Sequence, residues 1–249
     1  MNKKVLSILI ALTLVFTISS VADAKRKKKK KKEAAYKVTA VTNGGSIAGV
    51  ATFAGTPPAD PMIQVTSDVE NCKSGTEMPR QKYIIADGKI ANAVIYLEDI
   101  KEGKDYPAEP LVFNNVTCKY EPHVGITFKG KEVTLRNSDP MFHNVHSYVD
   151  GKTLLNLGLP DPGFEVTKKM KKDGIMEVKC DAHPWMLGYI FIATNPYAAV
   201  SAPDGSYTLT DVPAGTYAIK AWHEGFGDLD LGTVTVEGGA VATVNVEYK

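Results

Sequence analysis

The sequence is dominated by short segments in which apolar and polar residues alternate and which end in turn signals. The segments are rich in Val, Ile, Thr, Tyr and Phe, which favour strands, and a period of two is typical of a strand with one buried face. Asp-Gly pairs at 87–88, 150–151 and 204–205 supply turns. The predicted strands lie at 46–55, 89–99, 111–117, 124–130, 132–137, 143–149, 175–180, 189–194, 206–212, 216–222, 232–238 and 242–248. We therefore expect an all-β chain built from sandwiches or barrels.

The first 24 residues carry the signature of a secretory signal peptide. Lys3 and Lys4 form a positive start, residues 5–18 are apolar, and Ala22-Asp23-Ala24 matches a cleavage site. The apolar run is too short for an ordinary membrane span, which favours cleavage after Ala24 over an uncleaved anchor. We expect the mature protein to be exported to the periplasm or the extracellular space, where disulfides are permitted.

Eight consecutive basic residues, Lys25 to Lys32, follow the cleavage motif. Like charges at this density repel and bury little surface, so residues 25–44 are expected to form a disordered tail and linker. Residues 33–249 carry 19 Lys and Arg against 27 Asp and Glu, so a basic tail precedes an acidic body. The tail could contact an anionic membrane surface or an acidic protein, or it could be a solvated segment that folds back on the acidic body. Nucleic acid is not an expected partner of such an exported, acidic body.

The last 55 residues contain a pattern of their own. Asp204-Gly205 forms a turn before one strand, and Pro213 and Gly215 shape the turn before the next. This part resembles the carboxypeptidase regulatory-like, or transthyretin-like, β-sandwich. The first strands of such a domain are matched far upstream, by GSIAGV at 45–50 and AVIYL at 93–97.

The resemblance therefore implies a discontinuous sandwich formed by 45–103 plus 195–249, with residues 104–194 inserted as a second domain. The alternative is a tandem arrangement in which the N-terminal part belongs to the middle domain. The insertion is favoured because each end of the chain lacks strands that the other end has. Despite its name, a domain of this type carries no peptidase chemistry, and we expect no enzymatic activity.

The inserted segment contains the residues suited to bind a metal. CDAHPWM, residues 180–186, brings together a cysteine, a histidine and a methionine in a chain with three cysteines and five histidines. A thiolate, an imidazole and a thioether suit copper, which favours two histidines and a cysteine with a more distant methionine. Such a site needs a second histidine, and MFHNVH at 141–146 offers one.

These two stretches resemble the cupredoxins, or blue copper proteins, and among them the amicyanin-like members. The preceding CKYEPHVGITFKGKEVTLRNSD, residues 118–139, matches a strand pair of the same family. The resemblance implies a Greek-key β-sandwich over 104–194 that is inserted into the transthyretin-like sandwich. Carried over by position, it also implies one copper ion, Cu(I) or Cu(II), bound by His143, Cys180, His183 and Met186.

The resemblance further implies a carrier of single electrons between redox partners, such as a cytochrome or a dehydrogenase. By family analogy, electrons are expected to enter and leave through the ring edge of His183, near the surface. An apolar docking patch is expected around this edge, formed by Met141, Pro184, Trp185 and Leu187. Phe142 and Leu187 depart from the amicyanin pattern, which has a proline and a basic residue there, and both changes affect that surface. Asn144 is expected to tie the two ligand stretches together.

The other two cysteines, Cys72 and Cys118, leave an even pair if Cys180 binds metal. An even pair in an exported protein favours a disulfide, although connectivity cannot be read from a sequence. Cys180 itself could instead be half of a disulfide. Two other functions stay open: copper storage or delivery without redox traffic, and a structural cell-surface sandwich whose site has lost its metal. The seven methionines do not cluster, which argues against storage.

Overall fold

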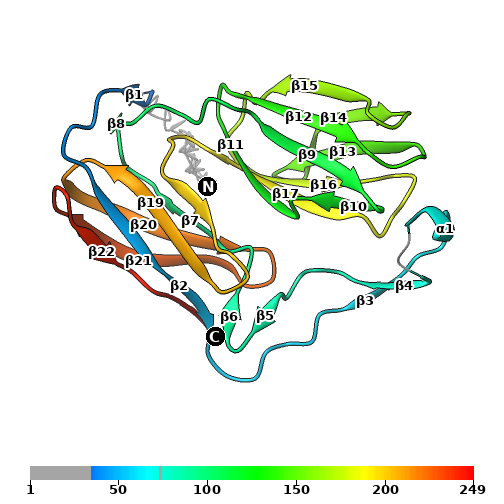
Figure 1. Ribbon diagram of the computed structural model, residues 1–249, viewed down its shortest axis with the longest axis horizontal. Coiled ribbons are helices and arrows are strands. Elements are labelled where there is room, and N and C mark those ends of the chain that lie inside the picture. Colours follow the sequence, from blue (N-terminus) through cyan, green and yellow to red (C-terminus); the bar gives the residue numbers. More distant parts are fainter. Residues whose placement is uncertain (1–34, 73–74) are drawn as a thin grey trace, which may run out of the picture. The chain divides into compact units, whose positions relative to one another are not determined.

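The computed structural model describes residues 35–72 and 75–249. The predicted signal peptide and the basic run at 25–32 lie outside these residues. Strands dominate the described part, and its helix is a single turn, α1 (Val69–Cys72) (Figure 1). Within the described ranges, no helix has the length and apolar character needed to cross a membrane. The predicted all-β fold class is confirmed.

Nine strands, green to yellow in Figure 1, form a sandwich of two sheets. Their bounds are β9 (Leu111–Val116), β10 (Lys119–Glu121), β11 (Val124–Phe128), β12 (Glu132–Asn137), β13 (His143–Val149), β14 (Lys152–Leu159), β15 (Glu165–Lys169), β16 (Gly174–Lys179) and β17 (Leu187–Ala193). One sheet has the order β10-β9-β12-β15 and the other β11-β17-β16-β13-β14. Alternate side chains of both sheets point inward and form one buried core, which includes Phe113, Leu135, Val145, Val178 and Ile190.

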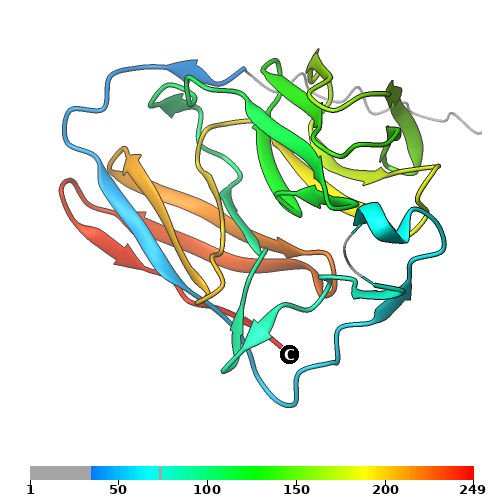
Figure 2. The ribbon, with the colours of Figure 1, turned by 45° about the vertical axis from the view of Figure 1, so that its right-hand side comes forward.

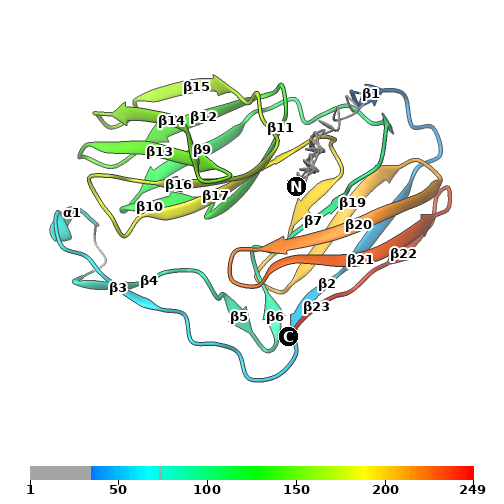
Figure 3. The same ribbon diagram turned by 180° about the vertical axis from the view of Figure 1, so that it is seen from behind.

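A second set of strands comes from both ends of the described chain. Its members are β2 (Gly45–Phe53), β5 (Ile85–Ala86), β6 (Lys89–Ile90), β7 (Val94–Leu97), β18 (Ala198–Val200), β19 (Ser206–Val212), β20 (Gly215–His223), β21 (Gly227–Val236), β22 (Val241–Thr243) and β23 (Val246–Tyr248). One sheet has the order β18-β7-β20-β21, and the other has the order β19-β2-β6-β5, with β22 and β23 also paired to β2 (Figure 3).

Gly49, in the GSIAGV stretch of strand β2, has a structural role. The strand pairs with β22 up to Ala48 and with β23 from Ala51, so Gly49 lies where its partner changes. A Cβ atom at Gly49 would lie 1.7 Å from the carbonyl oxygen of Val244. Glycine therefore allows the backbone between β22 and β23 to approach β2.

The strand pairings bear on the organisation expected from the sequence. Strands β2 and β7 pair with strands between 198 and 248, whereas the strands between 111 and 193 pair among themselves. This is the connectivity that an insertion would have. The domain boundaries, and the likeness of the discontinuous sandwich to transthyretin-like domains, stay predictions.

A small unit that we call the cap comprises residues 62–72 and 75–79. Strands β3 (Met62–Gln64) and β4 (Glu77–Pro79) pair antiparallel, with α1 between them in the sequence. Buried Val65 and Met78 of the cap belong to the core of the 111–193 sandwich. In Figure 2 the cyan turn α1 lies beside the green and yellow strands. Apolar side chains from the range 45–103 thus complete the core of the other sandwich.

A disulfide between Cys72 of the cap and Cys118 fastens the cap to the sandwich. The sequence left open whether these two cysteines pair with each other, and the structure shows that they do. A further short parallel pair, β1 (Lys37–Val38) with β8 (Glu102–Gly103), lies outside both sandwiches.

Candidate metal centre

Strand register brings the two predicted ligand stretches together. Strands β13 and β16 are antiparallel, and His146 lies opposite Lys179. His143 starts β13 and Cys180 directly follows β16, so both residues lie at the same end of this strand pair. The apolar alternation that buries one face of each strand fixes this register, because a slip of one residue would turn that face outward.

The second ligand stretch is a short closed loop. Strands β16 and β17 are paired as far as Lys179 and Leu187, which closes the loop 180–186 at its base. Within the loop, the Met186 amide donates a hydrogen bond of 2.9 Å to the His183 carbonyl. The loop thereby directs both Cys180 and His183 toward the end of β13.

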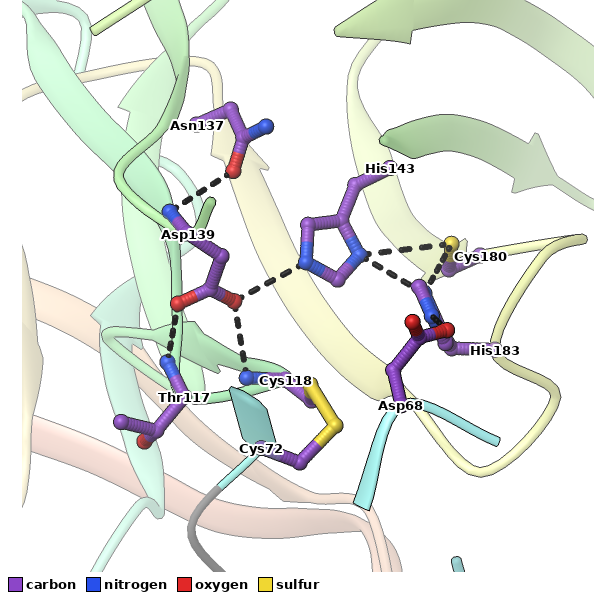
Figure 4. The surroundings of a disulfide bond; sticks show 9 residues. All are labelled: Asp68, Cys72, Thr117, Cys118, Asn137, Asp139, His143, Cys180 and His183. Carbon is purple, nitrogen blue, oxygen red and sulfur yellow. Dashed lines mark hydrogen bonds and ion pairs between the residues drawn. A yellow bond between two sulfur atoms is a disulfide. The ribbon is translucent and has the colours of Figure 1, made fainter. Parts of the chain in front are cut away.

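Three potential ligand atoms converge in this space (Figure 4). The Nδ1 atoms of His143 and His183 are 2.9 Å apart, and the Cys180 Sγ atom lies 3.8 Å and 3.6 Å from them. The exposed fractions of the three residues are 0 %, 2 % and 2 % for His143, Cys180 and His183. Two imidazole nitrogens and one free, buried cysteine thus face one another away from solvent.

Carboxylates set the orientation of both imidazole rings. The His143 Nε2 atom is 2.9 Å from Asp139 Oδ2, and the His183 Nε2 atom is 3.0 Å from Asp68 Oδ2. An ionised carboxylate only accepts hydrogen bonds, so each Nε2 carries a proton, and in the neutral form of each ring Nδ1 keeps its lone pair. Two lone pairs at 2.9 Å repel unless a proton or a cation lies between them. The donor set beside Cys180 is one that copper favours, so the residues present fit this metal.

Asp139 is itself held by the backbone. Its carboxylate accepts hydrogen bonds from the amides of Thr117 (2.6 Å) and Cys118 (2.8 Å), and the Asn137 side-chain oxygen accepts one from the Asp139 amide. Burial raises the pKa of Asp139, but the hydrogen bonds with His143 and the two amides outweigh burial and lower it. Asp139 therefore stays ionised and fixes the His143 ring.

His183 has a comparable balance of forces. Burial lowers its pKa, but the hydrogen bonds with Cys180 and Asp68 act in the opposite direction and leave the pKa raised overall. Its charged partner Asp68 comes from the cap, 115 residues away in the sequence. The candidate centre is therefore assembled from the cap as well as from the sandwich.

The expected role of Asn144 is confirmed. Its amide donates to the Cys180 sulfur at 3.4 Å. Its side-chain oxygen accepts from the Asp181 amide at 2.6 Å, and its side-chain nitrogen donates to the Asp181 carboxylate at 2.8 Å. Asn144 thus connects the His143 strand to the Cys180 loop and stabilises the sulfur.

Met186 and a second group of atoms complete the surroundings. Met186 is buried in the ligand loop and belongs to the same core as Cys180, and its role as the fourth ligand stays a prediction. Ligand-type atoms of Cys118, Asp139 and His143 also lie within 4.8 Å of one another. The Cys118 sulfur, however, is bonded to Cys72 and is not a thiolate.

The prediction that the His183 ring edge is exposed within an apolar patch is wrong. His183 is 2 % exposed and Trp185 is 6 % exposed, so neither ring forms an exposed apolar patch. Met141 and Leu187 are half-buried, and Pro184 alone of the five residues is exposed. The cap is the physical reason, since Asp68 occupies the Nε2 side of the His183 ring that family analogy placed in solvent.

Sequence reasoning assigned no role to Asp139 or Asp68. Asp139 had a signal, because it ends the stretch 118–139 that matches the cupredoxin strand pair, four residues before His143. Asp68 had none, because its contact with His183 depends on how a distant segment folds.

Comparisons with known proteins bear on about a third of the chain. No protein-family model matches, and neither does any curated protein. Among solved structures, a purple cupredoxin from Nitrosopumilus maritimus is 24 % identical over 33 % of this chain and 99 % of its own, with a TM-score of 0.30. Amicyanin from Paracoccus versutus is 19 % identical over 39 % of this chain and 96 % of its own, with a TM-score of 0.31. A reduced Cu(I) form of an amicyanin variant is 23 % identical over 35 % of this chain and 86 % of its own, with a TM-score of 0.30.

Proposed function

We propose that the protein binds one copper ion and carries single electrons between redox partners. The observation that supports this most directly is the convergence of the His143 and His183 Nδ1 atoms with the Cys180 sulfur in a buried space. Both Nε2 atoms are bound to carboxylates, which leaves these three atoms to hold a cation. We assign Met186 as the fourth, weaker ligand because it closes the same loop.

The chain prepares this site before any metal arrives. Asp139 and Asn144 hold His143 and Cys180 in place through hydrogen bonds that belong to the fold itself. Bound copper would supply a couple that gains or loses one electron. A rigid, buried ligand set changes little between oxidation states, and a small structural change favours rapid electron transfer. Catalysis of a substrate reaction is not part of the proposal.

Copper storage or delivery is the second candidate. The burial of His183 favours it, because an electron carrier of this type usually presents one ligand ring to its partner. Under this alternative the cap protects the metal, and the protein exchanges copper rather than electrons.

Addition of Cu(II) to the purified, metal-free protein tests the proposed site. We expect an intense blue colour from thiolate-to-copper charge transfer, and we expect Cys180→Ser to abolish it. A colourless complex or a failure to take up copper would refute the proposal. Protein-film voltammetry then separates the two candidates. An electron carrier cycles reversibly and rapidly, whereas slow or irreversible cycling indicates storage.

We also propose that the protein works after export, in the periplasm or outside the cell. The signal-like residues 1–24 support this, and so does the Cys72–Cys118 disulfide, which is a bond typical of oxidising compartments. The basic run at 25–32 is proposed to contact anionic lipid or an acidic protein. Cell fractionation with and without residues 1–24 tests the location.

A further inference from the structure

The cap delivers a charged group to a ligand of the proposed copper site. Asp68 Oδ2 lies 3.0 Å from the His183 Nε2 atom. The Asp68 side chain is 40 % exposed, whereas that of His183 is 2 % exposed. The carboxylate therefore stands between the buried ring and solvent, on the side of the ring that points away from Cys180 (Figure 4).

The backbone of the cap holds Asp68 in an unusual conformation. Its φ angle is +49°, in the left-handed region that non-glycine residues rarely adopt. Its carbonyl accepts hydrogen bonds from the amides of Asn71 (3.0 Å) and Cys72 (2.9 Å), so the residue opens the helical turn. Cys72, four residues on, is bonded to Cys118. A backbone conformation with positive φ costs free energy and persists where the surrounding structure enforces it. Here the enforced conformation places the Asp68 carboxylate against His183.

The opposite ligand has a matching arrangement. Asp139 contacts the Nε2 atom of His143, so each proposed histidine ligand has its own carboxylate. A carboxylate partner fixes the tautomer and the orientation of the ring, and it makes the imidazole a stronger electron-pair donor to a metal. A stronger, more negative ligand set stabilises Cu(II) more than Cu(I), because the interaction grows with the charge of the ion.

We propose that Asp68 is a positioning residue of the metal centre, which orients His183 toward the metal and lowers the reduction potential of the site. This inference rests on the proposed copper function. It gives the cap a chemical role: the cap excludes solvent from His183 and substitutes a fixed negative charge for it. It also means that electrons do not enter through an exposed His183 edge.

Three variants of the full chain test the role of Asp68. Asp68→Asn removes the charge but keeps an oxygen acceptor and tolerates positive φ, whereas Asp68→Ala removes both. Glu70→Gln is the matched control, because it removes the same charge from the exposed surface of α1, two residues away. Any effect of general surface charge appears in the control as well.

The first measurements use the copper-loaded variants. Cu(II) affinity, measured by competition with a chelator, is expected to fall roughly 10–100-fold in Asp68→Ala and less in Asp68→Asn. The reduction potential should rise in the same order, by about 59 mV for each tenfold loss of Cu(II) over Cu(I) affinity. Equal shifts in Asp68→Asn and Glu70→Gln, or no shift in either Asp68 variant, would overturn the proposal.

The second measurement needs no copper and therefore separates this inference from the proposed function. Nitrogen NMR of the metal-free protein should show His183 with its proton on Nε2 in the wild type and in Glu70→Gln. In Asp68→Ala the His183 signals should report exchange between tautomers. A wild type that fails to bind copper but shows the fixed tautomer would refute copper binding and keep the positioning role. An unchanged His183 signal in Asp68→Ala would refute the positioning role alone.

Discussion

Opening the Cys72–Cys118 disulfide is expected to release the cap. The bond joins residues 46 positions apart, and the chain-entropy model assigns about 4 kcal/mol at 25 °C to a closed loop of that length. Among its noncovalent contacts, the cap buries Val65 and Met78, at roughly 2 kcal/mol each. Partly buried Ile63 and Val69 pack against the same core, and Asp68 contacts His183. A two-stranded pair with one helical turn is not stable by itself in water.

The test replaces Cys72 and Cys118 with alanine and follows urea unfolding of the metal-free protein. With a slope of about 2–3 kcal/mol per molar urea, a loss of about 4 kcal/mol moves the midpoint down by roughly 1.3–2 M. Hydrogen exchange should locate the loss in the cap, where the Val65 amide donates to the Thr76 carbonyl, and at its base, where the Arg80 amide donates to the Pro61 carbonyl.

Reductant provides the control for this experiment. Wild-type protein in reductant should match the double variant, and the double variant should not respond to reductant at all. An unchanged midpoint with protected cap amides would refute the reasoning, because it would mean that the cap is held by its noncovalent contacts.

Two further predictions concern titration and ligand support. His223 is buried and its pKa is lowered to about 4, chiefly by burial. An unfolded histidine has a pKa near 6.5. Between about pH 6.5 and 4 the unfolded state therefore binds more protons than the folded state. About 3 kcal/mol of the free energy of unfolding present at neutral pH is lost as the pH falls through this range. His223→Gln should flatten this loss in urea unfolding at pH 7 and pH 4.5, and an equal loss in both proteins would contradict the assignment. Asp139→Asn should lower Cu(II) affinity roughly 10–100-fold in chelator competition, because the carboxylate supports His143; an unaltered affinity would count against that support.

Much of the fold was predictable because its signals are local. Strands rich in β-branched residues, such as those at 124–130 and 132–137, were predicted within a few residues of β11 and β12. Strands β14 and β15 were missed. Strand β14 contains four leucines and no β-branched residue besides Thr153, and leucine favours helices at least as much as strands.

In the candidate site, too, the features with local sequence signals were predictable and those that depend on distant contacts were not. Cys180 and His183 lie in one short motif, and His143 lies in another, so their residue types and spacing indicated a metal. The exposure of His183 was predicted wrongly, because exposure depends on what else covers the ring. The covering residue Asp68 reaches it only through the folded cap, and no periodicity or motif in the sequence marks that contact.

The pairing of β13 with β16 has a consequence for the way the two strands can move. The same register that places His146 opposite Lys179 also sets His143 beside Cys180. A slip of β13 by one residue would turn the His143 side chain to the opposite face of the sheet. A cation bound by both residues would therefore stabilise the native register of β13 and β16 and raise the energy of every slipped pairing relative to it. Metal occupancy and the resistance of this strand pair to slippage should then rise and fall together.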